Sequence, residues 1–219
     1  MALYALLDFD TLKKYNISIK DFCKTTKGLK AKIIQYRDKN SSLEEKTKRI
    51  KEIRKFWKKT LIINDTLELL PFADGLHIGQ EDLENLCKKH NLSPFEIIEK
   101  IKNGKWEIKN NKFYFTQQKN NKNKIIGLST HNKEEILKAN QLPLSYIGLG
   151  AYRPTTTKNT SNILGEKIIE LIKYSYHPVA IIGGVKIYDK IPAKFKVVGS
   201  DICKLMYIQL KKKRIFKKK

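Results

Sequence analysis

Eight short apolar runs recur along the chain and constrain its fold more than any other feature. Their hydrophobic residues are nearly continuous rather than alternating, which is typical of strands buried on both faces of a parallel sheet. The runs lie at residues 3–9, 31–39, 60–66, 75–80, 124–130, 145–151, 178–185 and 195–201. Because segments with helical periodicity separate several of them, the pattern predicts an α/β fold.

The number of runs favours a closed barrel. Eight strands alternating with helices predict a compact (β/α)8 TIM barrel that occupies residues 1–219 as a single domain. A doubly wound open sheet is the alternative architecture. No GxGxxG motif follows the first run, which weakens a dinucleotide-binding form of that sheet.

Three segments depart from the strand–helix rhythm. Residues 84–123 form a long insertion after the fourth run, and the alternation around Asn110 and Asn111 predicts a β-hairpin within it. The connection between the seventh and eighth runs, residues 186–194, is too short for a full helix and predicts only a turn or two. Residues 209–219 form a basic tail, which is typical of a frayed, solvated end.

The formal net charge of +23 allows two interpretations. A basic surface attracts nucleic acid, and such a protein would use the predicted hairpin at 105–124 and the tail at 209–219. The lysines are nevertheless spread over nearly every segment, arginine is scarce, and no RNP1-type aromatic run is present. These observations favour solvated helix faces over a nucleic-acid surface, with oligonucleotide binding as the alternative hypothesis.

The sequence also predicts where the protein works. No apolar run approaches the roughly 18 residues that a membrane helix needs, and residues 1–14 lack the features of a signal peptide. We therefore expect a cytoplasmic protein. Cys23, Cys87 and Cys203 are far apart and odd in number, so they are expected to be reduced, structural thiols.

Polar residues gather where the predicted strands end, and in a parallel barrel all these ends open on one face. The residues are Gln35, Arg37, Lys39, Asn64, Asp65, Gln80, Glu81, Asp82, Ser129, His131, Thr155, Thr156, Thr157, Lys158, Gly183, Gly184, Gly199 and Ser200. The cations and hydroxyls among them are suited to phosphate or pyrophosphate. Asp65 and Asp82 are oxygen ligands of the kind that Mg²⁺ takes, and the glycine-rich turns suit a second phosphate.

Each of these residues also has a structural explanation. Asp65 could cap a helix, and Arg37 and Lys39 could lie on an edge strand. His77 lies in the middle of a strand and is expected to be structural, and His131 is expected to start a helix rather than act as a base. The occurrence of so many polar residues at consecutive strand ends favours an enzyme with a pyrophosphate leaving group and a phosphorylated partner.

Six segments resemble the thiamine-phosphate synthase family, and the resemblance covers residues from about 3 to 202. They are "QYRDK", "IINDT", "ADGLHIGQEDL", "IIGLSTHN", "YIGLGAYRPTTTK" and "IIGGV". The resemblance implies a (β/α)8 barrel that joins 4-amino-2-methyl-5-hydroxymethylpyrimidine diphosphate to a thiazole phosphate and releases pyrophosphate. The related thiazole tautomerases share the fold and a histidine corresponding to His131. They typically lack the aspartate of "GQED" and the pattern of "PTTTK", so the resemblance favours the synthase.

The resemblance also implies a role for individual residues. It assigns Mg²⁺ to Asp65 and Asp82. It implies that catalytic contacts to the diphosphate come from Arg37, Lys39, Ser129 and Lys158. It implies that the two substrates are also contacted by Gln35, Asn64, Thr155, Thr157, Gly184, Val198 and Ser200. Loss of pyrophosphate would leave a pyrimidinylmethyl cation, so catalysis would rest on electrostatic stabilisation of the departing anion without a protein nucleophile. Arg153, where relatives differ, would add a cation near the mouth.

Overall fold

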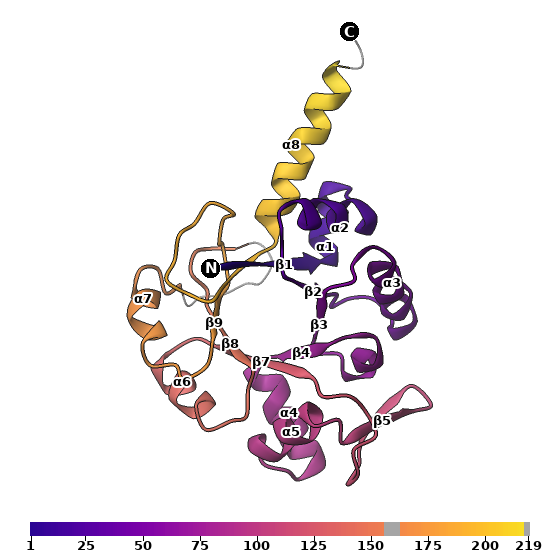
Figure 1. Cartoon of the computed structure of the whole chain (residues 1–219), viewed down its shortest axis with the longest axis vertical. Helices are drawn as coiled ribbons and strands as arrows, with labels where there is room; N and C mark the ends of the chain where they lie inside the picture. The colour runs from indigo at the N-terminus through magenta and orange to yellow at the C-terminus, as the bar shows by residue number, and fades with distance from the viewer. Residues whose placement is uncertain (156–162, 217–219) are drawn as a thin grey trace.

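A closed ring of eight parallel strands forms the centre of the computed structural model, which describes residues 1–155 and 163–216 (Figure 1). The order around the ring is β1-β10-β9-β8-β7-β4-β3-β2. The strands are β1 (Ala2–Asp8), β2 (Ile33–Arg37), β3 (Thr60–Asn64), β4 (Gly75–Ile78), β7 (Ile125–Thr130), β8 (Tyr146–Leu149), β9 (Val179–Ile181) and β10 (Phe195–Val198). Each apolar run contains one strand, which confirms the predicted barrel and excludes the open sheet.

Helices surround the ring and cover the outer faces of the strands (Figure 1). They are α1 (Phe9–Tyr15), α2 (Ile19–Gly28), α3 (Leu43–Phe56), the 3-10 helix η1 (Leu67–Phe72), α4 (Gln80–His90), α5 (Pro94–Lys102), α6 (Lys133–Ala139), α7 (Lys167–Ile172) and α8 (Ser200–Phe216). Helix α3 begins with a capping box, in which Ser42 accepts from the Glu45 N–H and Glu45 accepts from the Ser42 N–H. Its buried residues Ile50 and Ile53 pack toward the strands.

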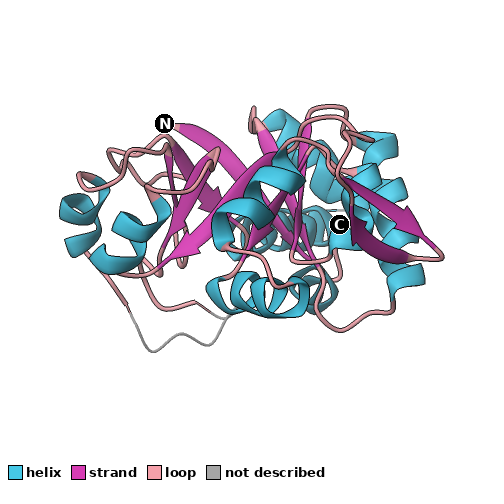
Figure 2. Cartoon of the chain, turned by 90° about the horizontal axis from the view of Figure 1, so that it is seen from below, coloured by secondary structure: helices cyan, strands magenta, loops and turns pink. Residues whose placement is uncertain are grey.

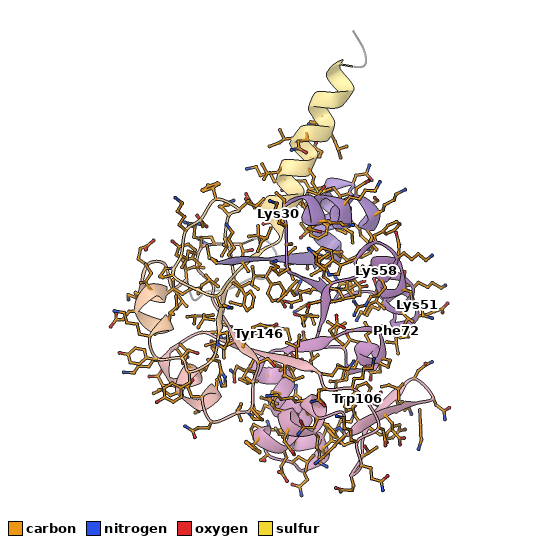
Figure 3. All side chains as sticks on the ribbon, in the orientation of Figure 1. Lys30, Lys51, Lys58, Phe72, Trp106 and Tyr146 are labelled. Atoms are coloured by element: carbon orange, nitrogen blue, oxygen red, sulfur yellow. The ribbon has the colours of Figure 1, made fainter. Side chains whose placement is uncertain are left out.

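The inside of the ring is packed by a small cluster of its own. Its buried members are Tyr4, Leu6, Ile33, Ile62, Tyr146, Ala180 and Val197. Tyr146 lies on the inner side of the ring, 5.9 Å from Tyr4 between ring centroids (Figure 3). A much larger cluster fills the space between strands and helices. Aromatic rings therefore fill part of the interior of the barrel.

The insertion between β4 and β7 contains two helices and a hairpin. Helices α4 and α5 are followed by β5 (Trp106–Lys109) and β6 (Lys112–Phe115), which pair antiparallel around Asn110 and Asn111. Both asparagines have positive φ, 48° and 57°, as a tight two-residue hairpin turn requires. Trp106 is buried against Phe113, and the hairpin lies at the edge of the molecule, outside the ring (Figures 2 and 3). The predicted hairpin is confirmed.

The two remaining departures differ in outcome. Only turns connect β9 to β10, as predicted. Residues 209–216 of the basic tail are helical rather than frayed as expected, because α8 continues to Phe216 and projects away from the barrel (Figure 1). Ile202, Cys203 and Met206 anchor the first half of α8 in the core, and lysine is a good helix former, so the helix continues beyond its anchor. No helix in the described part of the chain is long and apolar enough to cross a membrane.

Candidate active site

A cavity of about 350 Å³ opens at the carboxyl ends of the barrel strands. The residues singled out in the sequence that line it are Gln35, Arg37, Lys39, Asn64, Asp65, Gln80, Glu81, Asp82, Ser129, His131, Thr155, Gly183, Gly184, Gly199 and Ser200. Closure of the barrel thus brings residues from seven separate strand ends to one place. One difference from expectation concerns Gln80, which begins α4, because β4 ends at Ile78.

Four of the residues singled out are not in this lining. Thr156, Thr157 and Lys158 lie outside the described residues. The Val198 side chain is fully buried in the core between the barrel and its helices, whereas its neighbour Val197 lines the cavity. Because successive side chains of a strand face opposite sides, only one of the two valines can face inward.

Two carboxylates meet at Gly79, just after β4. Asp65 follows β3 directly, has a φ of 59°, and accepts a hydrogen bond from the Gly79 N–H at 3.3 Å. Asp82, in the first turn of α4, places its Oδ2 where it would lie only 2.8 Å from a Cβ on Gly79. A side chain at position 79 would therefore displace the Asp82 carboxylate from this position. The neighbouring Asn64 amide donates to the second oxygen of Asp65.

The electrostatics of the cavity favour a cation between these carboxylates. Burial, and then the charge of Asp82, raise the pKa of Asp65 to about 6, although Lys39 and Arg37 lower it in part. Among the described lining residues, Asp65, Glu81 and Asp82 oppose only Arg37 and Lys39, three negative charges against two positive. Two carboxylates completed by phosphate oxygens and water are the ligand set that Mg²⁺ commonly takes. The residues therefore fit a magnesium ion bound together with a phosphorylated ligand.

Arg37 is held by a buried carboxylate that sequence reasoning missed. Its guanidinium pairs with Asp8 at the end of β1. Asp8 also accepts hydrogen bonds from the Thr11 N–H at 2.9 Å and the Thr11 hydroxyl at 2.6 Å, as the N-cap of α1. Because arginine has five N–H donors, others remain for an anion. Asp8 thereby fixes the position of the Arg37 guanidinium and leaves some of its N–H donors available to a ligand.

The loop that carries Lys39 is braced by Asp38, whose side chain is buried. Asp38 accepts hydrogen bonds from Arg49 at 2.6 Å and from the Tyr36 hydroxyl at 2.9 Å. Burial opposes the charge of Asp38, but hydrogen bonds with the side chains of Tyr36, Ser41 and Arg49 lower its pKa, so it stays ionised at neutral pH. Since Asp38 directly precedes Lys39, this brace limits where the Lys39 backbone can lie.

Hydrogen bonds link the side chains on the floor of the cavity. The Tyr4 hydroxyl donates to Gln35 at 3.0 Å, and the Gln35 amide donates to Asn64 at 2.7 Å. The hydroxyls of Tyr4 and Tyr146 are 2.9 Å apart. Burial raises the pKa values of both tyrosines, so they remain neutral hydrogen-bonding groups. The network orients Gln35 and Asn64 toward the ligand space.

His77 belongs to the same network, although its mid-strand position predicts only a structural residue. Its Nδ1 is 3.0 Å from the Tyr146 hydroxyl and its Nε2 is 2.9 Å from the Ser129 hydroxyl. A Cβ on Gly148 would lie 2.7 Å from the imidazole ring, so a glycine there makes room for His77. His77 lines the cavity. His77 therefore lies in the barrel interior rather than in the outer core, and its ring positions Ser129.

His131 lies on the cavity wall immediately before α6. Its Nδ1 is 2.9 Å from Glu135, which also accepts a hydrogen bond from the His131 N–H. The N-cap of α6 is the next residue, Asn132, as the expectation of a helix start implied. His131 is thus tied to the first turn of α6 while it faces the cavity.

Comparison with known proteins identifies the family. A family model described as thiamine monophosphate synthase matches residues 14–98 and 110–193. The gap between the two matched segments falls in α5 and β5, within the insertion.

Curated relatives agree with this match. The thiamine-phosphate synthase of Dictyoglomus turgidum is 34% identical over 197 residues, which cover 84% of this chain and 76% of that protein. The thiamine-phosphate synthase of Persephonella marina is 35% identical over 161 residues, which cover 71% of this chain. The match spans 64% of the Persephonella protein, a little less than two thirds of its length.

A solved structure agrees in fold. Thiamine phosphate pyrophosphorylase from Pyrococcus furiosus superimposes with a TM-score of 0.63 at 19% identity, covering 95% of this chain and 96% of that one. At this identity the likeness shows the barrel fold alone. The family model and the sequence relatives carry the assignment: the chain belongs to the thiamine monophosphate synthase family.

Proposed function

We propose that the protein is a thiamine-phosphate synthase, which joins 4-amino-2-methyl-5-hydroxymethylpyrimidine diphosphate to a thiazole phosphate and releases pyrophosphate. The observation that carries the proposal is the meeting of Asp65 and Asp82 at Gly79, in a cavity that Arg37 and Lys39 also line. Family membership supports it. The two small-molecule substrates are the proposed partners, and the three unpaired cysteines favour the cytoplasm as the site of the reaction.

The proposed chemistry needs electrostatics and positioning more than proton transfer. The bond between the pyrimidine methylene carbon and the diphosphate oxygen breaks, and its electron pair leaves with pyrophosphate. The thiazole nitrogen then bonds to the methylene carbon. Arg37, fixed by Asp8, and Lys39, whose backbone is braced by Asp38, meet the charge that grows on the leaving group. Magnesium bound by Asp65 and Asp82 would supply further positive charge to that group.

The remaining lining residues hold the reactants in place. Gln35 and Asn64, oriented by the floor network, would contact the pyrimidine and the diphosphate. Ser129 is positioned by His77, and the Gln80 amide donates to the Ser129 carbonyl at 2.6 Å. On the strength of the resemblance, we keep the backbone N–H groups of Gly184 and of Val198 to Ser200 as contacts to the thiazole phosphate, and Lys158 as a contact to the diphosphate. Thr155 and Thr157 would lie near the thiazole phosphate and the diphosphate.

The test is pyrophosphate release with both substrates, with and without Mg²⁺, in wild type, Asp82→Asn and Glu84→Gln. Glu84 is a matched control because it lies on the same helix, exposed and paired with Lys88. We expect release to require both substrates and Mg²⁺, to fall at least 100-fold in Asp82→Asn, and to change less than twofold in Glu84→Gln. Thermal stabilisation of the protein by Mg²⁺ and pyrophosphate should disappear in Asp82→Asn.

Absence of release in wild type under every condition would refute the synthase. Metal-independent conversion of a thiazole phosphate that requires His131 and survives Asp82→Asn would instead identify a thiazole tautomerase. Strongly salt-dependent binding of oligonucleotides without any release would favour the nucleic-acid alternative.

A further inference from the structure

An ion pair beside the cavity joins Arg153 to Asp189. The two guanidinium nitrogens of Arg153 lie 2.6 and 3.2 Å from the two carboxylate oxygens of Asp189, a bidentate arrangement. Neither residue lines the cavity. Arg153 is therefore not the extra cation near the mouth that the sequence led us to expect, because its charge is already matched by Asp189.

Arg153 supports the glycine turn that follows β9. Its N–H donates to the Gly183 carbonyl at 3.0 Å, and its guanidinium donates to the Gly184 carbonyl at 3.4 Å. A Cβ on Gly184 would lie 2.7 Å from the Cβ of Arg153, so the turn packs directly on this residue. Both glycines have positive φ, 87° and 63°, and both line the cavity. Arg153 thus holds from outside a turn that faces the ligand space.

Asp189 closes the connection that carries this turn. It accepts a hydrogen bond from the Lys186 N–H at 2.8 Å in addition to those from Arg153. Burial opposes the charge of Asp189, but these bonds hold its pKa below the usual value, so the pair stays ionised at neutral pH. Only turns connect β9 to β10, so the connection has no helix of its own. Asp201, in the first turn of α8, accepts a hydrogen bond from the Ile187 N–H at 3.0 Å and pairs with Lys186 at 3.3 Å. The pair of Arg153 and Asp189 adds the link from this connection to the segment that follows β8.

We propose that Arg153 and Asp189 are positioning residues for the phosphate of the thiazole substrate. The pair sets the backbone of Gly183 and Gly184, whose N–H groups would receive that phosphate, and neither side chain contacts the substrate. The inference rests on the proposed function. A displacement of about 1 Å at a binding site can lower turnover about 100-fold, so a pair acting through the turn has a measurable effect.

The kinetic test compares the two substrates in Arg153→Met, Asp189→Asn and Arg153→Lys. We expect the KM for the thiazole phosphate to rise at least tenfold in the first two variants and less in Arg153→Lys, which keeps the charge but not the bidentate fork. The KM for the pyrimidine diphosphate should change less than twofold. The double variant Arg153→Asp with Asp189→Arg should recover part of the loss, which a general loss of stability would not do.

Arg54→Met is the matched control. Arg54 pairs with Asp74 at 2.9 Å before β4, at the opposite end of the barrel, and neither residue lines the cavity. It should lower thermal stability without separating the two KM values. Circular dichroism identifies any variant that does not fold, and the lysine and charge-reversed variants then carry the test.

Calorimetric titration with thiazole phosphate, in the presence of Mg²⁺ and pyrophosphate, separates this inference from the proposed function. Wild type that binds the thiazole phosphate without turnover would refute the synthase, yet weaker binding by Arg153→Met would still support the positioning role. Equal changes in both KM values, unchanged binding in the variants, or no binding by wild type would each overturn the inference.

Discussion

Asp65 lies one residue beyond β3 in a left-handed backbone conformation, with its carboxylate bonded to the Gly79 N–H and close to Asp82. Nonglycine residues with positive φ are uncommon and occur often at functional sites. Here the conformation turns the side chain toward the start of α4. Two carboxylates are thereby held together, and the charges of Lys39 and Arg37 offset burial and the charge of Asp82 only in part. An unliganded protein tolerates this arrangement only at a cost in stability.

That cost makes a prediction about pH. The folded-state pKa of Asp65, about 6, exceeds the usual value of roughly 4, so protonation favours the folded state. In the metal-free protein this carboxyl lowers stability above pH 6, and the loss disappears as the pH falls toward 4. Titration followed by carboxyl carbon NMR should show a midpoint near pH 6 for Asp65.

Two further measurements complete this prediction. The midpoint should fall in Asp82→Asn, because the like charge is gone, and it should fall in wild type when Mg²⁺ is added. An Asp65 midpoint near pH 4 in metal-free wild type would contradict the carboxylate arrangement described above.

The residues at strand ends are predictable from sequence because closure of the barrel brings every strand end to one face. The sequence does not indicate the roles of Asp8 and Tyr146, and it predicts only a structural role for His77, which lines the cavity. Asp8 precedes a helix and so has the pattern of an ordinary cap, and near-continuous apolar runs do not indicate which side chains face the inside of a ring. The residues on the floor of the cavity are therefore determined by the register of the barrel strands, which cannot be predicted from the local sequence.

At the scale of elements, the hairpin β5–β6 follows from its turn residues, whereas α8 does not follow from its charge. Asparagine tolerates positive φ better than most residues, so Asn110 and Asn111 identify the turn directly. The charge of the basic tail predicts a frayed end, because net charge indicates solvation. It does not indicate that preceding residues of the same helix are packed in the core. Helix α8 extends from residues packed in the core, and that packing is tertiary.

The hairpin turn gives a prediction about stability. Glycine adopts positive φ without strain, so Asn111→Gly should leave the free energy of unfolding unchanged or raise it by up to about 1 kcal/mol. A β-branched residue is strained there, so Asn111→Val should lower it by about 1 kcal/mol or more. Urea denaturation measures both. Because the hairpin does not line the cavity, turnover should be equal in both variants, and lower turnover in Asn111→Val alone would contradict this separation.

At the scale of the whole molecule, α8 both completes the core and projects from it (Figure 1). Among the α8 residues whose burial the structure describes, 200–211, the buried ones are Ile202, Cys203 and Met206, while Leu205 and Ile208 are exposed. The described core contacts of this helix therefore come from its first half, and the helix packs against α1, α2 and β1.

Truncation separates these halves. A chain that ends after Ile208 should keep the full turnover and a melting temperature within a few degrees of wild type. A chain that ends after Gly199 exposes the surface that the three anchor residues cover, and each large core side chain removed costs about 2–5 kcal/mol, so it should not fold stably. Thermal unfolding and pyrophosphate release test both chains. Loss of stability in the longer chain would show that the exposed half also supports the fold.

The pairing of β1 with β10, in which Ala2 lies opposite Phe195, has a consequence for protein synthesis. During synthesis β1 precedes the other barrel strands, and one of its edges stays unpaired until β10 has been made. During translation the ribosome therefore presents an unclosed sheet with two unpaired edges, which are templates for association with other chains. Contacts of such high sequence separation also form slowly. The seam between β1 and β10 is accordingly the place where newly made chains of this protein are most exposed to misassembly.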